Sequence, residues 1–415
     1  MKRSIVVCMM LVLICGLVFL GCAKKSDGAG AKVVYWTMWN EAEPQGQVIG
    51  RAAEAFTKET GIKIDINFNG RDIRKTLQPA LDAGEVIDMF DEDIDRVNGA
   101  WGTYLLPLDS YIAKSYPTTG GSPYSQAISQ ALLDLVRLRG GGSVKTIPYQ
   151  PFIFTTMYNK DLFAQAGITS LPKNWTEMLD ACAKLKANGV AGITVDDAYM
   201  AALFGYNIDR LAGYDVCRAM VDADDFSHPA VLEFGRIWEN MARNGYVHPN
   251  AAGNVWPSGQ IQDFAAGKAA MYLNGTWLPN EIKGNAPNMK WGSFAWPEMG
   301  GGDGTNANNV SAQSFGINKN SKYPEEAFRF IVYLTTGQWD VTLAQESLGI
   351  PLANNSKWPD ALAEAKAVME NTTKVLPWAA GMEDKAEINA KIKENFARLI
   401  KGDYNAQQFA DAMKR

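Results

Sequence analysis

Hydrophobic and polar positions along the chain follow two different periods. Over 62–68, apolar residues alternate with polar ones, which is the pattern of a half-buried strand. Over 46–60, apolar residues recur at helical spacing, and Gly61 follows where a left-handed helix cap belongs. The elements predicted in this part are strands over 32–36, 62–68 and 86–90 and helices over 46–60 and 73–83. Strands that alternate with helices at these distances indicate βαβ units and a parallel sheet with helices on its faces.

The rest of the chain is mostly helical in pattern, with three extended or irregular stretches. An extended run over 144–158 contains Pro148 and Pro151, and prolines there suggest a crossover between domains rather than a central strand. Gly and Asn are frequent over 299–309, which looks like a second linker, and 349–354 is a candidate for a third. The predicted helices lie over 126–138, 175–188, 229–244, 261–266, 324–335 and the whole tail from 359. Two α/β lobes joined by more than one crossover would form a hinge with a cleft.

The N-terminal residues have the pattern of an export signal. Two basic residues begin it, residues 5–20 are almost wholly apolar, and Cys22 follows before the chain turns polar. A Cys at this place resembles a bacterial lipoprotein signal, in which the Cys is lipidated, although Phe19 and Leu20 depart from its usual residues. The alternative is a plain membrane anchor, because the apolar run is near the lower limit for spanning a bilayer. The expected segments are a signal peptide over 1–21 and a flexible tether over 22–31.

Composition and charge narrow the class of ligand. Apolar residues make up 47% of the chain and charged residues 20%, which is typical of a globular protein. When Lys2 and Arg3 are removed, the 40 basic residues fall to 38 against 45 acidic ones, a net charge of −7. A weakly acidic body outside the cytoplasm argues against nucleic acid or anionic lipid as the main ligand.

The cysteines and histidines favour neither a metal site nor a catalytic triad. Cys182 and Cys217 remain beside Cys22 after processing, and we expect these two to be free and buried. His228 and His248 each precede a Pro in a turn-like context, which is typical of surface loops. The sequence has no G-x-S-x-G or H-E-x-x-H spacing, so we expect no metal and no cofactor.

Aromatic and acidic residues follow two of the predicted strands. Trp39 and Glu41 come after the first strand, and ligands of open α/β sheets bind outside the carboxyl ends of strands. The third strand is followed by four carboxylates and one cation: Asp91, Glu92, Asp93, Asp95 and Arg96. Grouping so many carboxylates costs free energy unless water solvates them or a ligand binds to them. Four interpretations are possible: a calcium loop, a catalytic pair as in a glycosidase, acceptors for sugar hydroxyls, or a solvated helix start. The calcium loop is disfavoured, because Arg96 stands at the position where such a loop needs Gly.

Further aromatic residues lie near the predicted crossovers and strand ends. They are Tyr149, Phe152, Trp277, Trp296 and Trp378. Each alone is more often a core residue than a binding residue, but their joint placement favours binding. Pyranose rings have apolar C–H faces that aromatic rings can cover, while carboxylates and amides bind the hydroxyl groups.

Six short motifs occur in order along the chain. They are MYNKDLF at 157–163, PKNWTEM at 172–178, FAAGKAAM at 264–271, NGTW at 274–277, FGIN at 315–318 and GIP at 349–351. In the second motif, Asn174 and Glu177 have capping-box spacing. Together these motifs resemble the family 1 extracellular solute-binding proteins of ABC importers, the group that contains maltose-binding protein, over nearly the whole mature chain.

The resemblance implies an α/β periplasmic-binding-protein fold, in which two discontinuous lobes close on a sugar or another small polar solute. Lobe 1 would comprise 32–148 with 310–348, and lobe 2 would comprise 149–309 with 349–415. The binding loops of the family map onto Trp39, Glu41, Asp91, Glu92, Asp93, Asp95, Arg96, Tyr149, Trp277, Trp296, Gln313 and Trp378. Phe152 departs from the family, whose members can hold a polar, ligand-binding residue near that point.

Three functions are compared on these grounds. The favoured one is a monomeric binding protein, tethered by lipidated Cys22 outside the cytoplasm, which hands a mono- or oligosaccharide to an ABC permease without covalent chemistry. The alternative is an envelope glycoside hydrolase that uses two of the carboxylates at 91–95 or Glu41. A surface adhesin is the third, and it would need long repeats or β-rich modules that the sequence lacks.

Overall fold

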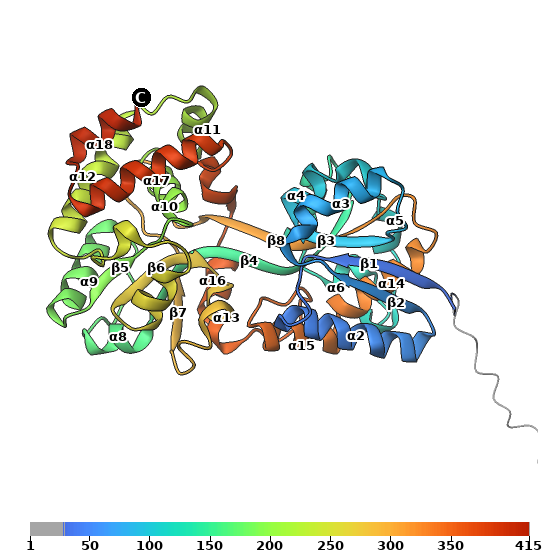
Figure 1. Cartoon of the computed structure of the whole chain (residues 1–415). Coiled ribbons are helices and arrows are strands. Elements are labelled where there is room, and N and C mark those ends of the chain that lie inside the picture. The colour runs from blue at the N-terminus through green and yellow to red at the C-terminus, as the bar shows by residue number, and fades with distance from the viewer. Residues whose placement is uncertain (1–27, 29, 415) are drawn as a thin grey trace, which may run out of the picture.

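Two α/β lobes lie side by side, and two long strands run from one lobe into the other (Figure 1). These shared strands are β4 (Thr146–Asn159) and β8 (Ala307–Ile317), which pair with each other antiparallel. The computed structural model describes residue 28 and residues 30–414, so the expected signal peptide and Cys22 lie outside the described residues. Within the described ranges, no helix is both long and apolar enough to cross a bilayer.

Lobe 1 is built around a sheet that helices cover on both faces (Figure 1). Its strands are β1 (Lys32–Thr37), β2 (Lys63–Phe68) and β3 (Met89–Asp93), completed by one end each of β4 and β8. Its helices are α2 (Pro44–Thr60), α3 (Ile73–Asp82), α4 (Ile94–Gly99), α5 (Asp109–Ile112), α6 (Tyr124–Ala127), α7 (Gln130–Arg139), α14 (Pro324–Thr335) and α15 (Gly337–Ser347).

Lobe 2 contains the other ends of β4 and β8 and a larger share of helix. Its strands are β5 (Ala191–Thr194), β6 (Ala269–Gly275), β7 (Trp291–Phe294) and β9 (Lys374–Leu376). Its helices are α8 (Lys160–Gln165), α9 (Trp175–Ala187), α10 (Met200–Ala212), α11 (Tyr214–Ala223), α12 (Pro229–Arg243), α13 (Leu278–Ile282), α16 (Ala363–Glu370), α17 (Ala386–Lys401) and α18 (Ala406–Met413), with a π-helix over Gly259–Ala265.

The sheet order explains how the two lobes share one backbone ladder. The strands run β2-β1-β3-β8-β4-β6-β5, with β7 beside β4 and β9 beside β8. In lobe 1, β1 pairs parallel with both β2 and β3, as the βαβ pattern predicts, whereas β8 enters antiparallel to β3. In lobe 2, β5 and β6 are parallel, and β6 is antiparallel to β4.

Local sequence signals account for most element boundaries. Helix α2 begins with Pro44 in its first turn, buries its face through Val48, Ala52 and Phe56, and ends at Gly61, whose φ of 75° is the left-handed cap expected there. Helix α9 begins at the predicted capping box, where the Asn174 side chain accepts a hydrogen bond from the Glu177 amide at 3.0 Å. Cys182 and Cys217 are free and buried, which confirms the expectation for both.

The hinge region contains a bulge in β4. The β4–β8 ladder shifts register between Tyr149 and Pro151, and the residue between them, Gln150, has a φ of 42°. The Gln150 side chain donates a hydrogen bond to the Ser347 hydroxyl at the end of α15. Beyond this bulge β4 leaves lobe 1 and pairs with β6 from Phe154 onward.

Three predicted boundaries are wrong. The stretch 349–354 was expected to cross into lobe 2, but it belongs to lobe 1, because the Asp340 carboxylate accepts hydrogen bonds from the Leu352 and Ala353 amides at 2.8 and 3.0 Å. The crossing follows at 355–362. The Gly-rich linker expected over 299–309 is a loop of lobe 2, and β8 itself makes the crossing. The tail from 359 is not wholly helical, because β9 interrupts it.

Candidate ligand-binding site

Five aromatic residues gather on lobe 2 where β4 leaves the hinge, and we call them the aromatic face: Phe152, Phe154, Tyr199, Trp277 and Trp378. The Trp277 ring lies 5.0 Å from Phe152 and 6.0 Å from Trp378, between ring centroids. The Phe154 ring lies 5.0 Å from Trp378 and is buried, whereas Phe152, Trp277 and Trp378 are each partly exposed. The structure therefore brings Trp277 and Trp378 together, 101 positions apart in the chain.

Backbone geometry explains how Trp277 reaches this face. It follows the carboxyl end of β6, and its ring folds back over Gly275, where a Cβ atom would lie 2.2 Å from the ring. The indole Nε1 donates a hydrogen bond to the hydroxyl oxygen of Tyr199 at 3.2 Å, just before α10 begins. The ring is thus fixed on one side, and its partly exposed area is available to a ligand.

Trp378 is positioned by a second set of constraints. It opens the turn Trp378–Gly381, directly after β9 and Pro377. Ala379 and Ala380 in this turn both have φ near 50°, which costs non-glycine residues free energy and marks a turn held by its surroundings. Helix α10 holds it, because a Cβ at Gly205 would lie 2.1 Å from the Ala379 carbonyl oxygen.

On lobe 1, Trp39 lies in a chain of polar contacts. Its Nε1 donates to the Tyr149 hydroxyl at 2.7 Å, and that hydroxyl donates to the Asp91 carboxylate. The Arg71 guanidinium lies 4.7 Å from the centre of the Trp39 ring and also pairs with Glu43 at 2.9 Å. Trp39 is only 7% exposed, so it is held among these partners and offers little free surface.

Two of the predicted ligand acceptors, Asp91 and Glu92, lie inside strand β3 instead of after it. The Asp91 side chain is fully buried, and besides Tyr149 it accepts the Met38 amide at 3.1 Å. Burial raises the pKa of Asp91 to about 7, against the opposing effect of these hydrogen bonds. Glu92 is also fully buried and is held by Arg74 at 2.5 Å and Arg96 at 3.4 Å.

The remaining members of the acidic cluster have structural partners. The Asp93 carboxylate caps α4 by accepting the Asp95 amide at 2.9 Å, and burial raises the pKa of Asp93 to about 6. Asp95 pairs with Arg139 at 2.5 Å. Because Asp91 and Glu92 are enclosed, the cluster does not present the facing pair of accessible carboxylates that a glycosidase needs.

Four other predicted residues lie in different environments. Trp296 is fully buried and packs against Trp175, apart from the rings of the aromatic face. Tyr149 is 1% exposed and stacks on Phe315 at 4.1 Å, so it supports Trp39 from within. Glu41 is exposed and lines a groove of about 780 Å³ between α2 and β2. Gln313 pairs with Tyr149 and Asp93 in the sheet, and its buried Oε1 has no hydrogen-bond donor among the described residues.

Sequence reasoning missed two members of the site. It included Phe152 among the candidate aromatic residues, and Phe152 packs against Trp277. Tyr199 and Arg71 carry no motif, and only the fold brings them beside Trp277 and Trp39. Across the described residues, no three metal-ligating side chains are grouped so that they could hold an ion.

Comparisons with known proteins agree with this architecture. A model of the family described as bacterial extracellular solute-binding protein matches residues 39–339. A protein of Brucella abortus (strain 2308), whose name describes it as a binding protein, is 24% identical over 417 residues, covering 95% of this chain and 94% of that one. The diacetylchitobiose binding protein of Streptomyces coelicolor is 26% identical over 220 residues, 51% of this chain and 46% of that protein.

The solved structure of a chitin oligosaccharide binding protein has the same fold. Its TM-score is 0.69 at 20% identity, and the match covers 93% of this chain and 98% of that one. This likeness confirms the periplasmic-binding-protein fold predicted from the motifs. The chain belongs to the family of bacterial extracellular solute-binding proteins, and it is the non-catalytic, extracytoplasmic binding component of an ABC importer.

Proposed function

We propose that the protein captures a mono- or oligosaccharide between its two lobes and delivers it to the permease of an ABC importer. The aromatic face carries this proposal. It offers three partly exposed rings, Phe152, Trp277 and Trp378, which suit the apolar C–H faces of pyranose rings. One sugar ring laid on one indole gains on the order of 2 kcal/mol at about 25 cal/mol per Å².

Polar groups on the lobe 1 side complement the aromatic face. Gln313 has an acceptor oxygen that no donor in the described part of the chain reaches, and Arg71 and Glu43 lie beside Trp39. Sugar hydroxyls can satisfy such groups when the lobes close. Two aromatic contacts and several hydrogen bonds are sufficient for micromolar binding, which corresponds to about −8 kcal/mol.

The relatives support a carbohydrate as the solute class. Several of them have names that specify a carbohydrate, among them a diacetylchitobiose binding protein and a chitin oligosaccharide binding protein, whereas a relative from Agrobacterium fabrum is named for sn-glycerol-3-phosphate. These names belong to those proteins, and the low identity leaves the particular sugar of this chain to be measured.

A lipid anchor at Cys22 is part of the proposal. The sequence pattern around Cys22 supports it, and residues 22–31 have the small and polar composition expected of a flexible tether. One acyl chain binds weakly to a bilayer, whereas several together anchor a protein stably. We expect the protein to fractionate with membranes in its native host and Cys22→Ser to abolish lipid incorporation, as measured by mass spectrometry of the N-terminal peptide. An N-terminal peptide of the wild type without lipid would refute the anchor.

A thermal-shift screen against a sugar panel tests the carbohydrate proposal. A ligand present at a hundred times its Kd adds about 2.7 kcal/mol of stability, which is readily measured as a raised Tm. We expect at least one neutral mono- or oligosaccharide to raise the Tm. The proposal fails if no sugar of the panel raises the Tm while amino acids, peptides or inorganic ions do raise it.

The first testable mutation is Trp277→Ala. Loss of about 2 kcal/mol of stacking should raise the Kd of the panel sugar about 30-fold, while the Tm without ligand falls by only a few degrees. Trp339→Ala is the matched control, because Trp339 is also partly buried but packs against Tyr333 in lobe 1. Titration calorimetry measures both. Equal Kd values for Trp277→Ala and the wild type would refute the stacking role.

A further inference from the structure

Strand β8 carries a hydroxyl group without a partner at the point where it passes between the lobes. The strand pairs with β9 up to Asn309 and with β3 from Gln313 onward, so among the described residues the stretch 310–312, which we call the crossing, pairs with β4 alone. Ser311 is the middle residue of the crossing. It is 5% exposed, and its hydroxyl oxygen has no hydrogen-bond partner in the described part of the chain. Burying a hydroxyl group in this way costs free energy, so the fold itself gains nothing from it.

The pairing of β8 with β4 shows on which side of the sheet Ser311 lies. Ser311 stands directly opposite Phe152 in the antiparallel ladder, and the side chains of directly opposed residues lie on the same face of a sheet. The Phe152 ring belongs to the aromatic face and lies 5.0 Å from the Trp277 ring, between centroids. The Ser311 side chain is therefore on the side of the sheet that carries the aromatic face, next to Phe152.

A second polar group without a partner lies two positions further along the same face. Side chains alternate along a strand, so Gln313 shares the face of Ser311, about 7 Å away along β8. The buried Oε1 atom of Gln313 has no donor among the described residues. Opposite Gln313 in the ladder stands Tyr149, whose hydroxyl accepts the indole N–H of Trp39 at 2.7 Å. The two polar groups thus lie between the aromatic face of lobe 2 and Trp39 of lobe 1.

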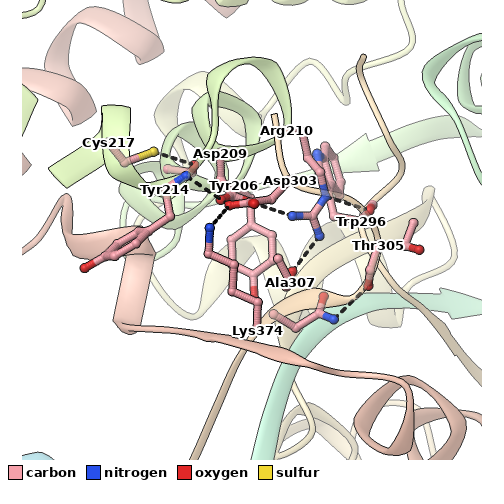
Figure 2. Close-up of polar contacts among 12 residues, drawn as sticks. Tyr206, Asp209, Arg210, Tyr214, Cys217, Trp296, Asp303, Thr305, Ala307 and Lys374 are labelled. Atoms are coloured by element: carbon pink, nitrogen blue, oxygen red, sulfur yellow. Dashed lines mark hydrogen bonds and ion pairs between the residues drawn. The ribbon is translucent and has the colours of Figure 1, made fainter. Parts of the chain in front are cut away.

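Both ends of β8 are anchored, which fixes the place of these groups. At the lobe 2 end, the Arg210 guanidinium donates to the carbonyl oxygen of Ala307 at 2.7 Å and to that of Trp296 at 3.2 Å (Figure 2). The Tyr206 hydroxyl accepts the Asn309 amide at 2.7 Å. At the lobe 1 end, β8 pairs with the whole of β3. Groups on a strand that is fixed in both lobes are preorganised, so a ligand binds them with little ordering of the protein.

We propose that Ser311 and Gln313 form a polar subsite, which binds hydroxyl groups of the sugar whose ring lies on the Phe152 end of the aromatic face. This inference rests on the proposed function and deepens it. An amide oxygen only accepts hydrogen bonds, whereas a serine hydroxyl both donates and accepts. The subsite therefore selects a sugar with one free hydroxyl that donates to Gln313 and another within reach of Ser311. Both oxygen atoms are enclosed in this structure, so the sugar reaches them when the lobes rotate about the crossing.

Ser314 offers a matched control on the same strand. Its hydroxyl oxygen is also buried and without a partner in the described part of the chain, but it lies three positions from Ser311 and therefore on the other face of β8, opposite Glu92 and Pro148. Removal of either hydroxyl breaks no bond within the fold, so Ser311→Ala and Ser314→Ala should both keep or slightly raise the Tm without ligand. A Tm that falls by several degrees in Ser311→Ala would show that this hydroxyl is bonded within the fold, and would overturn the proposal.

Binding distinguishes the two serines. The probe is the panel sugar that gives the largest thermal shift with the wild type, and titration calorimetry of the full-length protein measures its Kd. We expect Ser311→Ala to raise this Kd about tenfold, because a sugar hydroxyl loses its partner, and Ser314→Ala to leave it unchanged. An unchanged Kd in Ser311→Ala, or an equal rise in both variants, would contradict the subsite.

Monodeoxy analogues of the same sugar test whether the contact is direct. The analogue that lacks the hydroxyl bound by Ser311 should bind the wild type about tenfold more weakly than the parent sugar does, and it should bind Ser311→Ala as well as it binds the wild type. If Ser311→Ala instead weakened the binding of every analogue by the same factor, the residue would act through the shape of the site, and the proposed contact would be wrong.

Failure of the subsite and failure of the proposed function give different results. If a sugar binds the wild type and Ser311→Ala equally well, only the subsite is overturned. If no sugar binds but another solute of the screen raises the Tm, the proposed function fails, and the Kd values of that solute for Ser311→Ala and Ser314→Ala decide whether Ser311 contacts a ligand. If no solute of the screen binds, both proposals fail.

Discussion

Glu92 shows how a charged side chain at a strand end can belong to the interior. Its carboxylate is fully buried, and the Asp93 amide and the side chains of Arg74 and Arg96 surround it. Both arginines are themselves partly exposed, so each bridges the buried charge to solvent. The residue therefore stabilises lobe 1 and has no free acceptor to offer a sugar.

Replacement of Glu92 tests this structural role. Glu92→Gln should lower the free energy of unfolding by about 2 kcal/mol, because it removes charge-assisted hydrogen bonds to two cations. The Kd for the panel sugar should not change. Asp95→Asn is the control, since Asp95 forms an exposed pair with Arg139, which is worth less than about 1 kcal/mol. Urea denaturation measures both, and an unchanged stability in Glu92→Gln would show that the pair is not formed.

Helix α10 links the interior of lobe 2 to its binding surface at the level of elements. Tyr199 precedes the helix and contacts Trp277, Gly205 in its middle meets the Trp378 turn, and Asp209 near its end pairs with Arg210 in the interior of lobe 2. The helix is buried from Met200 to Arg210, so its position is fixed by contacts on all sides. A change at the middle of the helix should therefore alter the affinity for the ligand.

Gly205→Ala is predicted to disturb the site without disturbing the helix. The new Cβ would lie 2.1 Å from the Ala379 carbonyl oxygen, so the Trp378 turn must move, and the Kd should rise at least tenfold. Gly50→Ala in α2 is the matched control, because its nearest atom would lie 3.9 Å away, and it should stabilise the protein by about 0.5–1 kcal/mol. Calorimetric titration and thermal melting separate the two effects. Tight sugar binding by Gly205→Ala would contradict the packing.

Element patterns explain what could be predicted from the sequence and what could not. The alternation over 62–68 predicted β2, and the capping box at Asn174 predicted the start of α9, because both signals are local. Strand β3 was placed three residues early, because its pattern seemed to end at Phe90 and acidic residues rarely continue a buried strand. The partners that permit their burial, Tyr149 and Arg74, come from distant segments.

The same limit applies to the candidate site. Trp277 and Trp378 were predicted together with Trp296, and nothing local distinguishes the three. Only the packing shows that Trp296 is enclosed by lobe 2 while the other two remain partly exposed beside Phe152. Whether an aromatic residue after a strand faces a ligand or the core depends on which helix covers it.

At the level of the whole molecule, buried carboxylates set how stability depends on pH. Burial raises the pKa of Asp91 to about 7, and of Asp196 and Asp340 to about 6, above their ordinary value of 3.8. The folded state therefore holds protons that the unfolded chain has lost between about pH 4 and 7. Stability contributed by these groups must fall as the pH rises through this window.

We accordingly expect a higher Tm at pH 5 than at pH 8, measured by calorimetry without ligand. Asp91→Asn should reduce the fall of the Tm with rising pH, because the amide does not titrate. The control Asp72→Asn should leave this pH dependence unchanged, because Asp72 is exposed. A Tm that rises steadily from pH 5 to pH 8 would show that these carboxyl groups are ionised in the folded protein.

The two shared strands also impose an order on biosynthesis. Lobe 1 begins at the N-terminus, but its sheet lacks a central strand until β8 is available, and α14 and α15 follow later still. A ribosome must therefore make about three quarters of the chain before the first lobe can close. We expect this order to delay folding of the first lobe during synthesis, and a fragment that stops before β8 to be degraded rather than accumulate as a half-protein.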